Sequence, residues 1–306
     1  MGRFIVKRMI QMFITLYLVV TATFFLMHAI PGGPFTREKP LPPAVIEALE
    51  AKFKLDQPLH VQYFDYVKGV FTFDFGPSFQ KVGVDVTDMI MKGLPASAKI
   101  GMMAVLVVLL IGIPLGIISA LKQNKWEDYV VTILATIGVT IPSFVMATLI
   151  IYVFSAKLQV LPSFGLKTWK HFIGPVIALS GFSLAFVARL TRSSMLEVLQ
   201  QDYIRTARAK GLSEFVVIGK HALKNALIPV ITYVGPMIAS ILTGSFVIEK
   251  IFAIPGMGKY FVESVGNRDY TVIIGVTVFY AAFYIIMVFI VDVIYGIIDP
   301  RIKLHD

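Results

Sequence analysis

The stretch YIRTARAKGLSEFVVIGKHALKN, residues 203–225, stands between two segments that are each apolar enough to cross a bilayer. It carries five Lys or Arg residues, and these alternate with apolar residues at the spacing of a helix. A loop that only fixes membrane topology needs its charges close to the ends of the spans. The alternation instead predicts a compact helical element that docks into another protein. A basic loop that only contacts anionic lipid is the plainer alternative.

The loop is predicted to contain two helices separated by a glycine hinge. Apolar residues at helical spacing predict a first helix from Met195 to Lys210. Gly211 follows, at the position where a helix reverses hand and ends. Ser213 is predicted to cap a second short helix, with Glu214 in its first turn. One apolar face of that helix is predicted to contain Phe215, Ile218 and Ala222.

The composition around this loop is that of a membrane protein. The chain of 306 residues is 57% hydrophobic and only 15% charged, and its mean hydropathy is +0.78. One soluble core cannot bury so much apolar surface, and a spanning helix needs about 20 apolar residues. The sequence therefore predicts an all-α, polytopic membrane protein with six transmembrane helices, at residues 9–30, 99–121, 129–154, 172–191, 226–248 and 272–297.

The distribution of Lys and Arg predicts the orientation. With the N-terminus inside, the inner segments hold more than twice as many of these residues as the two short outer loops. Cytoplasmic loops carry such an excess, so both termini and the loop at 192–225 are predicted to be cytoplasmic. The first span, within residues 1–30, is expected to remain as an N-terminal anchor, because its apolar run is long for a signal peptide.

Residues 31–98 are predicted to form an extracytoplasmic segment. A helix is expected to open after Pro42 and Pro43, where a proline fits the first helical turn. A second helix is predicted around Tyr63, Tyr66 and Val70, which recur at helical spacing. The aromatic residues of this segment are expected to cover the mouth of a pore or to lie at the membrane interface.

The loop resembles the so-called EAA loop of ABC importer permeases. Arg205, Thr206 and Ala207, followed by Gly211, match it in the form RTARAKG that is typical of peptide and nickel importers. Arg205 stands where the family name implies a glutamate, and seventeen residues separate Gly211 from Pro229, which is also usual in the peptide branch. In that family the loop is a coupling helix that inserts into a cleft on the ATPase subunit. The resemblance assigns this role to Arg205, Thr206, Ala207, Arg208, Ala209, Lys210, Gly211, Ser213 and Glu214.

Further motifs extend the resemblance over almost the whole chain. HAIPGGPF, DFGPSF, ARLTRSSMLEVL, GSFVIEKIFAIPGMGKYFVESVGNRDY and DPRI resemble, in the same order, the B-type membrane subunit of oligopeptide ABC importers. This resemblance implies a type I importer permease fold in the bacterial inner membrane, with residues 99–306 as its five-span core. It also implies a second homologous permease of C-type, two ABC ATPase subunits and an extracytoplasmic peptide-binding protein. Dipeptide or nickel importers share much of the pattern and remain alternatives.

A path for oligopeptides is expected to be wide, wet and lined by hydroxyl groups. Ser and Thr side chains also bond backbone or bridge helices, which is the alternative at every position. Pro142 and Pro236, like the GxxxG pair Gly112 and Gly116, suit helices that kink or pack closely, although both residue types are common in spans. The candidate path-lining residues are Thr136, Thr140, Ser143, Ser180, Ser183, Thr232, Tyr233, Ser240, Thr243 and Ser245.

Other function classes find no support in the sequence. It contains no GxxxxGK[ST] phosphate-binding loop, so a partner must hydrolyse any ATP. Cysteine is absent, and no HExxH or paired carboxylates occur, so no enzyme, metal or cofactor site is expected. No groove-reading motif accompanies the positive charge, which argues against nucleic acid. Asp292 is the one acidic residue within a span, whereas an autonomous ion-coupled carrier is expected to bury carboxylate relays.

Overall fold

The computed structural model describes residues 2–31, 33–35 and 42–298, and these form helices, three π-helical turns and one isolated β-bridge between Pro77 and Asp85. The all-α prediction is confirmed for the described residues. The π-helical turns are η1 (Val108–Gly112), η2 (Ile151–Lys157) and η3 (Val217–Ala222). The α-helices are α1 (Gly2–His28), α2 (Pro43–Lys52), α3 (Leu59–Thr72), α4 (Val86–Val107), α5 (Ile113–Leu121), α6 (Trp126–Thr140), α7 (Ser143–Ile150), α8 (Lys170–Leu199), α9 (Asp202–Ala209), α10 (Glu214–Val216), α11 (Leu223–Ala226), α12 (Ile228–Leu242), α13 (Phe246–Ile251), α14 (Met257–Asn267) and α15 (Tyr270–Ile298).

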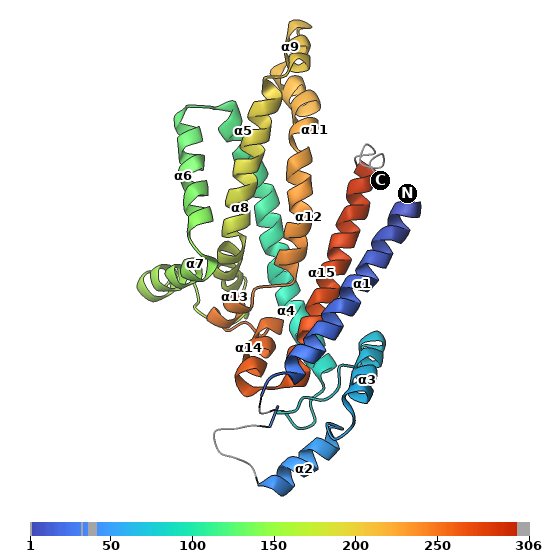
Figure 1. Ribbon diagram of the computed structural model, residues 1–306. Coiled ribbons are helices and arrows are strands. Elements are labelled where there is room, and N and C mark those ends of the chain that lie inside the picture. Colours follow the sequence, from blue (N-terminus) through green and yellow to red (C-terminus); the bar gives the residue numbers. More distant parts are fainter. Residues whose placement is uncertain (1, 32, 36–41, 299–306) are drawn as a thin grey trace.

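The long helices run side by side and give the molecule two distinct ends (Figure 1). One end carries α9 and α11, together with the start of α1 and the end of α15. The opposite end carries α2 and α3, with α14 close by. These are called the α9–α11 end and the α2–α3 end below. The two helices predicted in the segment 31–98 are confirmed as α2 and α3.

Five helices of the described chain are long and apolar enough to cross a membrane: Ile5–His28, Val86–Leu121, Lys170–Leu199, Ile228–Ile251 and Tyr270–Val293. The span predicted at 129–154 is a bent pair of helices rather than one continuous helix, and Pro142 lies at the bend, where a kink was expected. It consists of α6 followed by α7 and η2, with a bend of 106° between them. Pro142 explains the break, because it lacks an N–H and forces the preceding Ile141 into an extended conformation. The predicted boundary at residue 98 lies inside α4, which starts at Val86.

The GxxxG pair, Gly112 at the end of η1 and Gly116 in α5, lies close to α8, in line with the predicted close helix contact. A Cβ atom on Gly116 would lie 2.5 Å from the carbonyl oxygen of Ala188 and 2.5 Å from Cβ of Thr191. Neither contact is possible for real atoms, so only glycine fits at Gly116. The π-helical turn η1 immediately precedes α5, in which Pro114 lacks an N–H.

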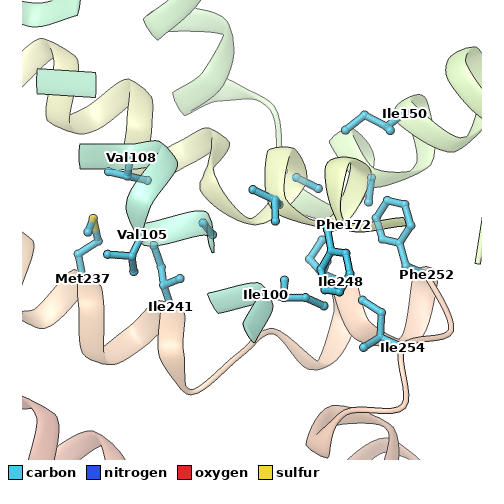
Figure 2. Close-up of a cluster of buried hydrophobic side chains, with 14 of the residues drawn as sticks. Ile100, Val105, Val108, Ile150, Phe172, Met237, Ile241, Ile248, Phe252 and Ile254 are labelled. Atoms are coloured by element: carbon cyan, nitrogen blue, oxygen red, sulfur yellow. The ribbon is translucent and has the colours of Figure 1, made fainter. Parts of the chain in front are cut away.

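A cluster of buried apolar side chains holds the bent pair against the bundle (Figure 2). Ile150 of α7 packs in the same cluster as Phe172 of α8 and Phe252, which follows α13. In a membrane, such close packing stabilises helix association through van der Waals contact. The bend is therefore fixed by neighbours. The labelled members of the cluster are Ile100, Val105, Val108, Ile150, Phe172, Met237, Ile241, Ile248, Phe252 and Ile254.

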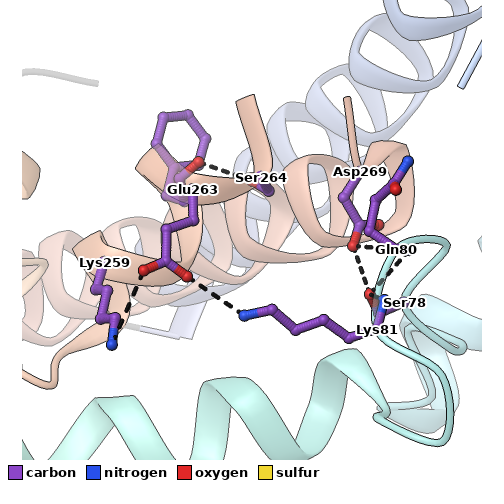
Figure 3. Close-up of polar contacts among 8 residues, drawn as sticks. Ser78, Gln80, Lys81, Lys259, Glu263, Ser264 and Asp269 are labelled. Carbon is purple, nitrogen blue, oxygen red and sulfur yellow. Dashed lines mark hydrogen bonds and ion pairs between the residues drawn. The ribbon is translucent and has the colours of Figure 1, made fainter. Parts of the chain in front are cut away.

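At the α2–α3 end, the buried carboxylate of Asp269 ties the DFGPSF loop to the start of α15 (Figure 3). The hydroxyl of Ser78 donates to Oδ2 of Asp269, and the backbone N–H of Phe79 donates to Oδ1 at 3.1 Å. Thr271 donates from Oγ1 to the carbonyl of Pro77 at 2.8 Å. Lys81 adds an ion pair of 3.3 Å with Glu263 on α14. These contacts bring together two motifs that are far apart in the sequence.

Candidate functional site

The segment between α8 and α12, residues 200–227 and called the basic loop below, is a folded unit rather than an open loop. Its elements are α9, α10, η3 and α11. The predicted continuous helix from Met195 to Lys210 is wrong, because α8 ends at Leu199 and Gln201 is extended before α9 begins. The apolar spacing continues through this break because the helices on both sides bury residues in one cluster. Asp202 then starts α9 with a negative charge, which favours a helix N-terminus.

A small apolar cluster packs the basic loop against the spans. Ile204 and Ala207 of α9 are buried together with Val217 and Ala222 of η3. The cluster also includes residues of the spans, so the loop is packed onto α5 and α8. Its buried members are Ala120, Met195, Ile204, Ala207, Val217, Ala222 and Ala226. Asn225 adds a hydrogen bond of 2.8 Å from Nδ2 to the hydroxyl of Tyr203.

The predicted hinge at Gly211 is confirmed by its φ of +76°. No atom lies within 4 Å of a Cβ placed there, so the requirement for glycine is conformational. Ser213 occupies the N-cap position of α10, but its side chain makes no capping hydrogen bond, and that part of the prediction is wrong. The hinge is instead closed by Arg208, whose Nε and Nη2 donate to the two carboxylate oxygens of Glu214 at 2.8 and 3.3 Å. This guanidinium lowers the pKa of the Glu214 carboxyl.

The exposed surface of the basic loop combines cations with two aromatic residues, Tyr203 and the more exposed Phe215. Arg205 and Lys210 are exposed, whereas Ala207 is only 5% exposed and supports the loop from within. Phe215 is 87% exposed, so it does not share the buried position of Ala222 that the predicted apolar face implied. An exposed aromatic residue on a surface that also carries arginine is typical of a protein contact. The other exposed members of the predicted coupling set are Thr206, Arg208, Ala209, Gly211, Ser213 and Glu214.

A buried ion pair near the base of the loop has no counterpart in the sequence predictions. Asp128 at the start of α6 is 3% exposed and accepts from Nε and Nη2 of Arg192 at 2.6 and 2.8 Å. The backbone N–H of Asn124 donates to the same carboxylate at 3.0 Å. The pair is bidentate, which fixes both the distance and the orientation of α6 relative to α8. The one sequence signal for this pair is the acidic first turn of α6, in which Asp128 lies.

The predicted path-lining residues lie in different environments. Ser180 and Ser183 are buried within the chain. Several hydroxyls donate to carbonyls of their own helix, as in the contact of Thr232 with Ile228 at 3.0 Å. Tyr233 packs against Phe186 with ring centroids 4.3 Å apart, which joins the faces of α12 and α8. Thr136, Thr140, Thr232 and Ser240 are exposed, and Ser143, Tyr233, Thr243 and Ser245 are half-buried.

Titratable residues do not form a metal site within the described part of the chain, where no group of three or more His, Asp or Glu residues could hold an ion. Asp292, the one acidic residue within a predicted span, lies 3.4 Å from Nε of Arg8 on α1. This contact joins the first and last spans.

Solved structures with a similar fold come from ABC transporters. The chain matches an inward-facing structure of the MetNI methionine ABC transporter with a TM-score of 0.55 at 16% identity, over 69% of this chain and 96% of that one. It matches an amino acid ABC transporter with histidines with a TM-score of 0.54 at 19% identity, over 70% and 94%. These similarities define the class of fold, a type I importer permease, and confirm that prediction.

The chain belongs to the family of binding-protein-dependent transport system inner membrane components, whose model matches residues 112–304. The model of the N-terminal part of these membrane components matches residues 1–101. The chain is 53% identical to the dipeptide transport system permease protein DppB of Bacillus subtilis (strain 168), over 100% of this chain and 99% of that protein. It is 46% identical to the oligopeptide transport system permease protein OppB of Salmonella typhimurium, over 99% and 100%. The chain is thus a multi-pass inner-membrane protein, and its predicted resemblance is confirmed.

Proposed function

We propose that this chain is the membrane subunit of an ATP-driven peptide importer and forms half of its translocation path. The full-length similarity to relatives named as dipeptide and oligopeptide permeases, at 53% and 46% identity, supports this substrate class. The partners are a second homologous permease of C-type, two ABC ATPase subunits and an extracytoplasmic peptide-binding protein. ATP hydrolysis is assigned to the ATPase subunits, since the sequence has no phosphate-binding loop.

The α9–α11 end is assigned to the cytoplasm and the α2–α3 end to the outside. The excess of Lys and Arg in the segments of the α9–α11 end supports this orientation. Residues 1–30 then form the anchor span, 31–98 lie largely outside, and 99–306 form the permease core with its loop at 192–225. Of the candidate path-lining residues, Thr232 and Ser240 fit best, because they lie on the exposed face of α12.

The basic loop is assigned as the element that docks on an ATPase subunit. Phe215 projects from a rigid base, and a buried aromatic residue ringed by polar contacts is the usual centre of a protein interface. Arg205 and Lys210 supply the basic rim. The cluster below contains Ala120 of α5 and Met195 of α8, so a force on the loop acts directly on two spans.

The replacement Phe215→Ala tests this assignment, because the exposed ring contributes little to folding. Removal of an interface hot spot costs about 2 kcal/mol or more, so ATPase retention on the tagged complex should fall at least about tenfold. ATP-dependent peptide uptake into proteoliposomes should fall with it. Phe64→Ala is the matched control, since Phe64 is 67% exposed on α3 at the opposite end. Unchanged retention and uptake in the Phe215 variant would contradict the docking role.

The substrate class is tested separately, with a labelled tripeptide and with Ni²⁺ as alternative cargo for the complete reconstituted complex. Uptake of the tripeptide that requires ATP and the binding protein is the expected result. Uptake of Ni²⁺ alone would replace the peptide assignment by the nickel alternative. Peptide uptake without ATP would make the chain an autonomous carrier.

A further inference from the structure

The α2–α3 end encloses a cavity of about 630 Å³, between α2, α3, the end of α1 and the start of α15. This volume is in the range of sites that hold small molecules. The rings of Phe53, Phe75 and Phe79 supply apolar walls, and Glu50, Lys52 and other residues of both charge signs lie around them. The cavity is therefore suited to a ligand that is partly apolar and carries no strong net charge.

Three polar groups in the cavity wall lack hydrogen-bond partners among the described residues. They are the hydroxyls of Tyr66 and Tyr270 and the side-chain carbonyl oxygen of Gln57. Tyr270 is only 5% exposed. A buried polar group without a partner costs folding free energy, and buried tyrosine hydroxyls usually have one. Burial also raises the pKa of the Tyr66 hydroxyl, which keeps it protonated and able to donate.

The remainder of this wall is held in place by satisfied hydrogen bonds. Gln62 donates from Nε2 to the carbonyls of Leu55 and Gln57 at 3.1 and 2.8 Å. Its Oε1 lies 3.3 Å from Nε2 of His28 at the end of α1. The turn that carries Gln57 is thus fixed to α3 and α1. Its unpartnered oxygen is a feature of an ordered wall, not of a loose loop.

We propose that this cavity binds a short peptide segment. The tyrosine hydroxyls donate to a peptide carbonyl or carboxylate, the oxygen of Gln57 accepts a peptide N–H, and the phenylalanine rings surround an apolar side chain. Donors and an acceptor together match an amide backbone, which a simple anion or cation does not. The two hydroxyls and the Gln57 oxygen are closed off from solvent, so the peptide must displace the side chains that cover them. The assignment rests on the proposed peptide function for its ligand class.

The test uses the complete complex in nanodiscs, with a fluorescent tripeptide that contains one phenylalanine and with the binding protein omitted. Tyr66→Phe and Tyr270→Phe each remove one donor and keep the ring. Each should weaken tripeptide binding about fivefold to tenfold, while thermal stability stays equal or rises because an unsatisfied group is removed. Tyr280→Phe is the matched control. Its hydroxyl also lacks a partner within the described chain, but Tyr280 does not line the cavity.

A second arm distinguishes the source of the peptide segment. The affinity of the purified binding protein for each complex is measured without free peptide. Weaker docking of the binding protein in the two cavity variants, but not in Tyr280→Phe, assigns the segment to that protein. Equal tripeptide binding and equal docking in all variants overturn the proposal. If the wild-type complex transports no peptide, the proposed function fails, and the two binding arms still decide what the cavity binds.

Discussion

At the α9–α11 end, an apolar cluster around Ile204 and Val217 supports a loop whose proposed docking side chains are exposed. At the α2–α3 end, the buried Asp269 anchors the DFGPSF loop, and three polar groups around a cavity have no hydrogen-bond partner among the described residues. Phe215 is exposed at the α9–α11 end, whereas the polar groups of interest at the α2–α3 end line a cavity. The two ends thus differ in where their notable side chains lie, on the surface at the α9–α11 end and around a cavity at the α2–α3 end.

Asp269→Ala should have the largest effect on this comparison, because it leaves the donors of Ser78 and Phe79 without the carboxylate that accepts from them. The loss should be about 3 kcal/mol of folding free energy, measured as a lower thermal midpoint in detergent. The thermal midpoint of the shape-conserving variant Asp269→Asn should lie between those of the wild type and Asp269→Ala. Asp88→Ala is the control, since Asp88 is exposed on α4. Equal loss in both alanine variants would show that the Asp269 contacts do not hold this end together.

Gly116→Ala should destabilise the packing beneath the basic loop, at the α9–α11 end, by a smaller amount. The added methyl group overlaps the backbone of Ala188, so α5 and α8 must separate, at a cost of about 1 to 2 kcal/mol. Gly181→Ala is the matched change in α8, where a Cβ meets no atom within 4 Å. Thermal unfolding should show a loss for the first variant and no loss for the second. If both variants have the same thermal midpoint, the close packing of α5 against α8 under the basic loop does not contribute to stability.

The ion pair of Arg208 and Glu214 should give the smallest effect, because both side chains are largely exposed. The folded pKa of Glu214 is lowered from its ordinary value of 4.5, so the contribution of the pair is present above that value. It is lost as the pH falls through the lowered folded pKa. Amide exchange in α9 and α10, corrected for intrinsic rates, should be unchanged between pH 7 and 5 and faster below 4. Glu214→Gln should abolish this dependence, and a wild-type change above pH 5 would refute it.

Much of the fold followed from local patterns in the sequence. Hydropathy located the five continuous spans, and glycine identified the hinge at Gly211 and the contact at Gly116. Each of these predictions rests on a pattern among residues that lie close together along the chain.

The missed features depend on contacts between distant residues. Pro142 indicated a kink, but the angle of 106° is fixed by packing of Ile150 against Phe172 and Phe252. The pairing of Asp128 with Arg192 joins helices whose separation no local pattern encodes. The exposure of Phe215 likewise depends on which neighbouring residues fill the cluster beneath it.

The bend after α6 has a consequence for the surrounding bilayer. A helix of 15 residues is about 22 Å long, whereas the hydrocarbon core is about 30 Å thick. The lipid beside α6 therefore cannot keep its full thickness against this helix alone. The exposed side chains of Phe144, Tyr152 and Phe154 on the turned segment supply the missing apolar surface. At this side of the bundle, the chain meets the membrane with a helix that is shorter than the hydrocarbon core, which is a hydrophobic mismatch.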